Sequence, residues 1–205
     1  MVLAYHVVFS TYGFWLPNDP RGSGSVYVGS NALLPFGLAT KTDERNSVAD
    51  RPHDRGVRRL ARSALRRPPV RLSGGLAQAA ARGFGRACAE GAYALHALAL
   101  MPDHVHAVIG RHGRSIRAIV GHLKARATRG LKEEGQWQTD GPVWGEGCRV
   151  VFLDSDERVR GATEYVEANP VRAGLRPQHW SIVVPWRGAG RRQKAPAKAG
   201  GEIRV

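Results

Sequence analysis

Cysteine is scarce in this sequence, and long apolar runs are missing. The two cysteines, Cys88 and Cys148, lie far apart and show none of the paired spacings of a zinc knuckle or zinc ribbon. We therefore expect reduced thiols in a cytoplasmic protein rather than a disulfide framework. No stretch approaches the roughly 18 apolar residues of a transmembrane helix, and the short apolar N-terminal segment follows no basic stretch. We therefore expect no contact with a membrane.

Acidic residues are also few. The chain of 205 residues holds 17 Asp and Glu against 31 Lys and Arg, which gives a formal net charge of +14. Such a surplus creates a positive potential suited to a polyanion, either nucleic acid or an anionic membrane surface. Because no long apolar run is present, nucleic acid is the favoured partner. The length favours one domain with insertions or tails, and we place that domain at residues 1–186.

Two histidines one residue apart follow an apolar run, in the stretch MPDHVHAVI at residues 101–109. On a β-strand, His104 and His106 project from the same face, while Val105 and its alternate neighbours pack on the other. Such a pair can offer two imidazoles to one metal ion. Two half-buried polar residues on a sheet are the alternative interpretation of this motif alone.

Hydrophobic periodicity predicts an alternation of strands and helices. Strands are expected at 3–11, 92–100, 104–109 and 149–153, and helices at 76–90, 116–133 and 156–169. The second and third strands should form a tight hairpin, and the first strand should be central. We expect Gly91 to follow the first helix directly, as the residue that terminates it, and Pro170 to force the end of the last helix.

This order is a split β-α-β pattern. It predicts an α+β fold, an antiparallel sheet with helices packed on one face. His104 and His106 should point to the open face, and a helix at the sheet edge could bring Tyr165 beside them. Asn169 lies one helical turn after Tyr165 on the same face.

Two stretches are strongly basic. Residues 45–71, within a poorly readable insertion at about 31–72, hold nine arginines against Asp50 and Asp54. They form either a solvated, partly disordered insertion or an arm that lies on phosphate. From residue 187 the composition predicts a disordered basic tail. The helix at 116–133 buries one apolar stripe, and its basic surface, which includes Arg114, Arg117, Lys124 and Arg126, is a solvated face or a phosphate contact.

The stretch MPDHVHAVI, the basic helix after it and the run EYVEANPVRAGL (164–175) together resemble a known family. They are similar to the single-tyrosine HUH transposases of bacterial insertion sequences, and among these to the REP-associated tyrosine transposases. The opening AYHVVFSTYGFWLPNDPRG also resembles the start of such proteins. The resemblance covers roughly residues 3–23 and 76–186.

The resemblance implies an RRM/ferredoxin-like fold, in the form known as the HUH endonuclease fold, and a Mg²⁺ or Mn²⁺ ion. It also implies that the protein cleaves and rejoins single-stranded DNA, at a hairpin or palindromic repeat, through a 5′-phosphotyrosine. By position, His104 and His106 match the metal-binding histidines and Tyr165 matches the nucleophile. Asn169 matches the polar residue that completes the metal site. We expect Arg172 to bind DNA together with Arg114, Arg117, Lys124 and Arg126.

Two other functions compete with this one. A domesticated DNA-binding protein could use the same fold without cutting, although it would not need the histidine pair and Tyr165 together. A metal-dependent hydrolase would need further ligands, but position 108 is Val and His112 lies in a glycine-flanked turn. The sequence leaves open whether the protein is a monomer or a homodimer.

Overall fold

A four-stranded antiparallel sheet organises the chain. The computed structural model describes all residues except 18, 20–27, 29, 38–51 and 190–205. In chain order its elements are β1 (Ala4–Ser10), the 3-10 helix η1 (Asn31–Phe36), α1 (Arg55–Ser63), α2 (Gly75–Gly91), β2 (Leu95–Leu100), β3 (His104–Gly110), α3 (Ile116–Glu133), β4 (Arg149–Leu153) and α4 (Asp156–Arg172).

The strands lie in the order β2-β3-β1-β4, and each neighbouring pair is antiparallel. The predicted hairpin of β2 and β3 and the central place of β1 are therefore confirmed. In the register of β1 against β3, Val8 lies opposite His106 and Ser10 lies opposite His104. Directly opposed residues of antiparallel strands point to the same face, so β1 and β3 present their polar residues together.

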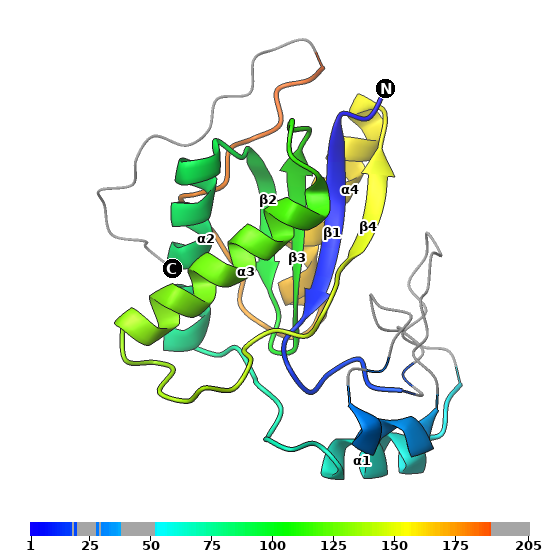
Figure 1. Cartoon of the computed structure of the whole chain (residues 1–205). Helices are drawn as coiled ribbons and strands as arrows, with labels where there is room; N and C mark the ends of the chain where they lie inside the picture. The colour runs from blue at the N-terminus through cyan, green and yellow to red at the C-terminus, as the bar shows by residue number, and fades with distance from the viewer. Residues whose placement is uncertain (18, 20–27, 29, 38–51, 190–205) are drawn as a thin grey trace.

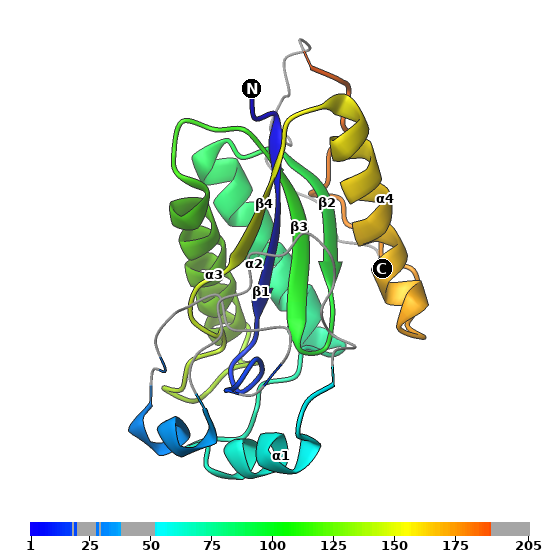
Figure 2. The same cartoon turned by 90° about the vertical axis from the view of Figure 1, so that its right-hand side faces the viewer.

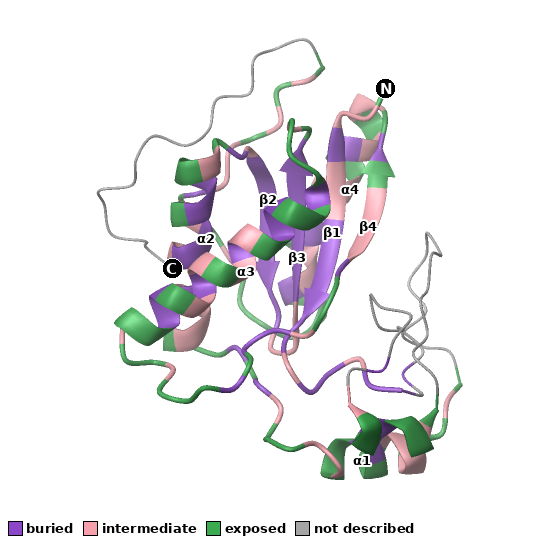
Figure 3. Ribbon diagram, in the orientation of Figure 1, coloured by how far each residue is buried: buried purple, intermediate pink, exposed green. Residues whose placement is uncertain are grey.

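Helices α2 and α3 pack on one face of the sheet (Figures 1 and 2), and this layer holds the main core. Val105, Ala107 and Ile109 of β3 are buried there, as period-two alternation predicted. Figure 3 shows burial concentrated in the sheet and on the helix surfaces that face it. The predicted α+β fold, with a four-stranded antiparallel sheet and packed helices, is confirmed.

Helix α4 lies against the opposite face, the one that carries the histidines (Figure 2). Its buried Val159 and Val166 pack on alanines of β2 and on Val108 of β3 in a second, smaller core. The expectation that a helix could approach the histidine pair therefore holds. The prediction of helices on one face only was wrong, because the apolar residues of α4 are buried against β2 and β3 on this second face. The helix therefore partly covers the face that the sequence left open.

The predicted ends of two helices and the predicted start of one strand were wrong. The last helix continues past Pro170 to Arg172, because a missing amide so near the end costs only one hydrogen bond of the final turn. Gly91 belongs to α2, and Ala92 takes the left-handed conformation with φ of 53°. A Cβ on Gly91 would lie 2.1 Å from Cζ of Tyr93, so this glycine is needed for close packing. As a result β2 begins at Leu95 and not at Ala92.

Part of the arginine-rich insertion is folded, since η1 and α1 both fall within it. Arg45 and Arg51 lie outside the described residues, and so does the predicted tail from residue 190 on. Among the described helices, none is both long and apolar enough to cross a membrane.

The close contact of α2 and α3 yields a stability prediction. A Cβ on Gly83 would lie 2.4 Å from the Ala127 Cα, so Gly83→Ala should force the helices apart and lower the free energy of unfolding by about 1–3 kcal/mol. Gly121, exposed on α3, has nothing within 4 Å of the same position. Gly121→Ala should instead raise stability by about 0.5–1 kcal/mol. Urea denaturation of both variants checks this, and equal effects would contradict it.

Candidate active site

His104 and His106 converge at the start of β3. Their Nε2 atoms lie 2.9 Å apart, and both side chains leave the same face of the sheet. Two ligands at right angles on an ion with metal–nitrogen distances of about 2.1 Å are about 3.0 Å apart. The pair therefore has the spacing of two neighbouring ligands of one divalent ion.

Each of these histidines is held through its other ring nitrogen. Nδ1 of His104 donates to Oδ1 of Asp103 at 2.6 Å, and Nδ1 of His106 shares a hydrogen bond of 3.1 Å with Nε2 of His6. Such partners fix the tautomer and the orientation of an imidazole that binds metal. Sequence reasoning missed His6 as a functional residue. The alternation of side chains along β1 could have identified it, because His6, Val8 and Ser10 point to the same face as the histidine pair.

The buried imidazoles of this cluster are neutral at pH 7. Burial, and then the positive charge of Arg149, lowers the pKa of His6 to about 4. Burial, and then the nearby His104 and His6, holds the pKa of His106 well below its usual value. A neutral imidazole offers a lone pair to a cation, so these shifts keep His106 ready to bind one.

Tyr165 reaches the histidines from α4. The centroid of its ring lies 5.8 Å from that of His106 and 5.8 Å from that of His6, edge-on to both. Its side chain remains partly open to solvent, with 37% of the residue exposed. The guanidinium of Arg172 lies 5.7 Å from the same ring. The structure therefore brings Tyr165, Arg172 and the histidine pair together from two elements.

Asn169 lies one turn after Tyr165, and its Nδ2 donates to the backbone oxygen of Tyr165 at 3.0 Å. This bond fixes the amide nitrogen and leaves Oδ1 as the atom that could bind a cation. Within the described residues no three His, Cys, Asp or Glu side chains gather as a metal site. The role of Asn169 as a ligand stays a prediction.

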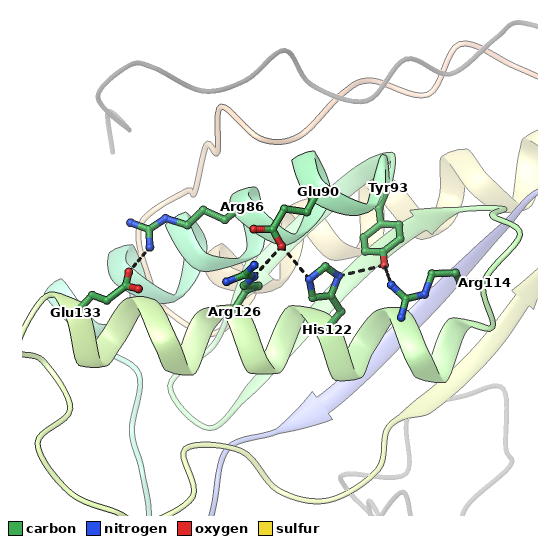
Figure 4. Close-up of polar contacts among 7 residues, drawn as sticks. All are labelled: Arg86, Glu90, Tyr93, Arg114, His122, Arg126 and Glu133. Carbon is green, nitrogen blue, oxygen red and sulfur yellow. Dashed lines mark hydrogen bonds and ion pairs between the residues drawn. The ribbon is translucent and has the colours of Figure 1, made fainter.

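The other basic residues predicted to bind DNA lie on or just before α3, in the layer on the opposite face of the sheet. Arg114 donates to the Tyr93 hydroxyl at 2.8 Å, and Nε of Arg126 pairs with Glu90 at 2.7 Å (Figure 4). Lys124 donates to the carbonyls of Gly145 and Gly147. Arg117 is exposed. Three of these four side chains thus hold the fold together, and DNA binding by the group stays a prediction.

Comparison with known proteins gives one family match. The model of the family described as "Transposase IS200 like" matches residues 64–169, just over half of the chain. The match spans α2, β2, β3, α3 and β4 and most of α4, so it includes the histidine pair and Tyr165. No curated protein matches.

Two solved structures are similar. One is a REP-associated tyrosine transposase bound to a REP hairpin, with 11% identity and a TM-score of 0.47 over 85% of this chain and 70% of that one. The other, from Deinococcus radiodurans R1 and described as a transposase, has 18% identity and a TM-score of 0.37, over 82% of this chain and 90% of that one.

Lys124 yields a prediction about pH. Burial lowers its pKa from 10.5 to about 8, so folding disfavours the charged form. Between pH of about 8 and 10.5, the Lys124 amine is therefore protonated in the unfolded chain and neutral in the folded protein. Because the unfolded state binds more protons in this range, the free energy of unfolding should rise by about 1–3 kcal/mol as pH increases from about 8 to 10.5. Lys124→Met should lack this rise. Urea denaturation across that range tests it, and identical pH profiles would refute the assignment.

Proposed function

The chain belongs to the IS200-like transposase family, and on that premise we propose that it cleaves and rejoins single-stranded DNA, with Tyr165 as the nucleophile. The observation that carries the proposal is the meeting of the Tyr165 ring with the converging His104 and His106. A divalent cation, Mg²⁺ or Mn²⁺, is the proposed cofactor, and a hairpin or palindromic repeat is the proposed DNA.

The residues present fit such a cation. Nε2 of His104 and of His106 would bind it, and Oδ1 of Asn169 is the candidate third ligand. All three donors are neutral, so a bound ion keeps its full charge and its remaining coordination positions. When bound, the ion polarises a phosphate oxygen and offsets the negative charge that repels a nucleophile. Asp103 and His6 hold the two imidazoles in place for it.

Tyr165 supplies the covalent step. Its phenol oxygen forms a bond to phosphorus and loses its proton, while the bond from phosphorus to the 3′ oxygen breaks and that oxygen leaves as a 3′ hydroxyl. The product is a 5′-phosphotyrosine, which keeps the energy of a phosphodiester for rejoining. One tyrosine holds one DNA end at a time, so two strand breaks need two subunits or two successive cycles.

The first test is covalent trapping. The protein, incubated with labelled single-stranded hairpin DNA and Mg²⁺ or Mn²⁺, should give a protein–DNA adduct on a denaturing gel. Tyr165→Phe removes the attacking oxygen and should abolish the adduct, and chelation with EDTA should do the same. Binding of many hairpins with no adduct would point to the DNA-binding protein that does not cut. Cleavage that survives Tyr165→Phe would make water the nucleophile and refute the mechanism.

A second test concerns the cation itself. Titration of the protein with Mn²⁺, followed by electron paramagnetic resonance, should show one site that His106→Ala abolishes. His6→Leu removes the partner of His106 and should weaken binding about 10- to 100-fold, because the imidazole loses its orientation. His6→Gln keeps a polar partner and should recover part of the loss. His122 on α3, in the layer on the opposite face of the sheet, pairs with Glu90 and gives the control His122→Ala. Unchanged affinity in His6→Leu would exclude the orienting role.

A further inference from the structure

The arginine-rich insertion contains a folded unit. Oδ1 of Asp54 caps α1 by accepting hydrogen bonds from the backbone N–H groups of Gly56 and Val57, at 2.7 and 3.0 Å. Ala61 on α1 is fully buried against Leu16, in a small core separate from the sheet. The described part of this insertion therefore has a fixed structure of its own, with a capped helix and apolar packing.

Six arginines of this unit, named here the arginine surface, are exposed: Arg55, Arg59, Arg62, Arg66, Arg67 and Arg71. Figure 3 shows the exposed side of α1. None of the six pairs with a carboxylate of a described residue, whereas Arg58 of the same helix pairs with the buried Asp19 at 3.2 Å. In the α2 and α3 layer, arginines such as Arg82 do pair with glutamates. The arginine surface thus keeps its charge unneutralised by these residues, which suits phosphate binding.

The unit is fixed to the turn that precedes His104. Oγ1 of Thr11, just after β1, donates to the Val70 carbonyl at 2.6 Å, and the Thr11 amide donates to the Asp103 carbonyl at 3.0 Å. The Leu72 amide donates to the Pro102 carbonyl at 2.8 Å. The segment after α1 therefore lies on the same turn as the histidine pair, and Figures 1 and 2 show α1 beyond that end of the sheet.

Two consecutive aromatic residues connect the arginine surface to the histidines. The guanidinium groups of Arg62 and Arg71 lie 5.3 and 5.9 Å from the centre of the Phe14 ring. The next ring, Trp15, lies 6.3 Å from that of His104. Trp15 takes a left-handed backbone conformation with φ of 58°, which is strained for a bulky residue and occurs mainly at functional sites. Phe14 and Trp15 therefore form a continuous contact between the arginine surface and His104.

We propose that the arginine surface binds the phosphate backbone of the DNA next to the phosphodiester that Tyr165 attacks. The inference rests on the proposed function, and it assigns the binding of the adjoining DNA to α1 and the segment after it, a surface that only partly overlaps the family match at residues 64–169. A strand held at the histidines and extending past Trp15 meets Arg62 and Arg71 first. Guanidinium groups that lie on aromatic faces keep their outer N–H groups for phosphate oxygens.

The test measures binding apart from cleavage. In a Tyr165→Phe background with EDTA, the affinity for a fluorescein-labelled hairpin oligonucleotide with single-stranded flanks is measured at several salt concentrations. Arg62→Gln with Arg71→Gln should raise Kd about 10-fold and reduce the slope of log K against log salt by about 1.4–1.8, as expected for two lost phosphate contacts. Lysine at both positions keeps the charge and should restore most of the slope.

The matched control is Arg111→Gln with Arg187→Gln, which removes the same charge from two exposed arginines, one just after β3 and one beside the start of α4, at the end of the sheet away from His104. It should change Kd and the slope little. Equal losses in both double variants, or no loss at Arg62 and Arg71, would overturn the proposal. Trapping with intact Tyr165 tests the proposed function separately: arginine-dependent binding without any adduct would refute cleavage and leave the arginine surface standing.

Discussion

The pairing of β1 with β3 is the constraint on which the rest of the structure depends. With Val8 opposite His106, the side chains of His6, His104 and His106 share one face, and Val7, Val105 and Ala107 fill the core on the other. A slip of one residue would send every side chain of a strand to the opposite face. It would bury the imidazoles beneath α2 and α3 and expose apolar residues. The same packing that stabilises the sheet therefore also assembles the site.

Local patterns account for much of the fold. Period two predicted the faces of β3, and the apolar stripe of α3, from Ile116 to Leu131, is buried as its spacing indicated. Element ends were less predictable, because Ala92 takes the left-handed position while Gly91 makes room for a ring that comes later in the chain. Close packing of this kind leaves no periodic signal in the sequence.

The site could be predicted only in part for a related reason. The spacing in β3 indicates that His104 and His106 are neighbours, but the contact of His6 with His106 joins residues 100 positions apart and needs the register of two strands. Likewise, the basic face of α3 suggested phosphate, while the partners of Arg114 and Arg126, Tyr93 and Glu90, come from the end of α2 or just after it. Charge alone does not show which cations are already paired.

The Val70 amide donates to the Tyr12 carbonyl at 2.9 Å, so the chain that leaves the sheet after β1 returns to the point where it left. The segment between these two residues is therefore a closed loop. The entropy of closing a loop grows slowly with its length, by about 0.6 kcal/mol for each doubling. A change in the length of this segment therefore costs little loop-closure entropy and can leave the turn before His104 in place. The segment between Tyr12 and Val70 can thus diverge in sequence and length while the sheet and its histidines stay fixed.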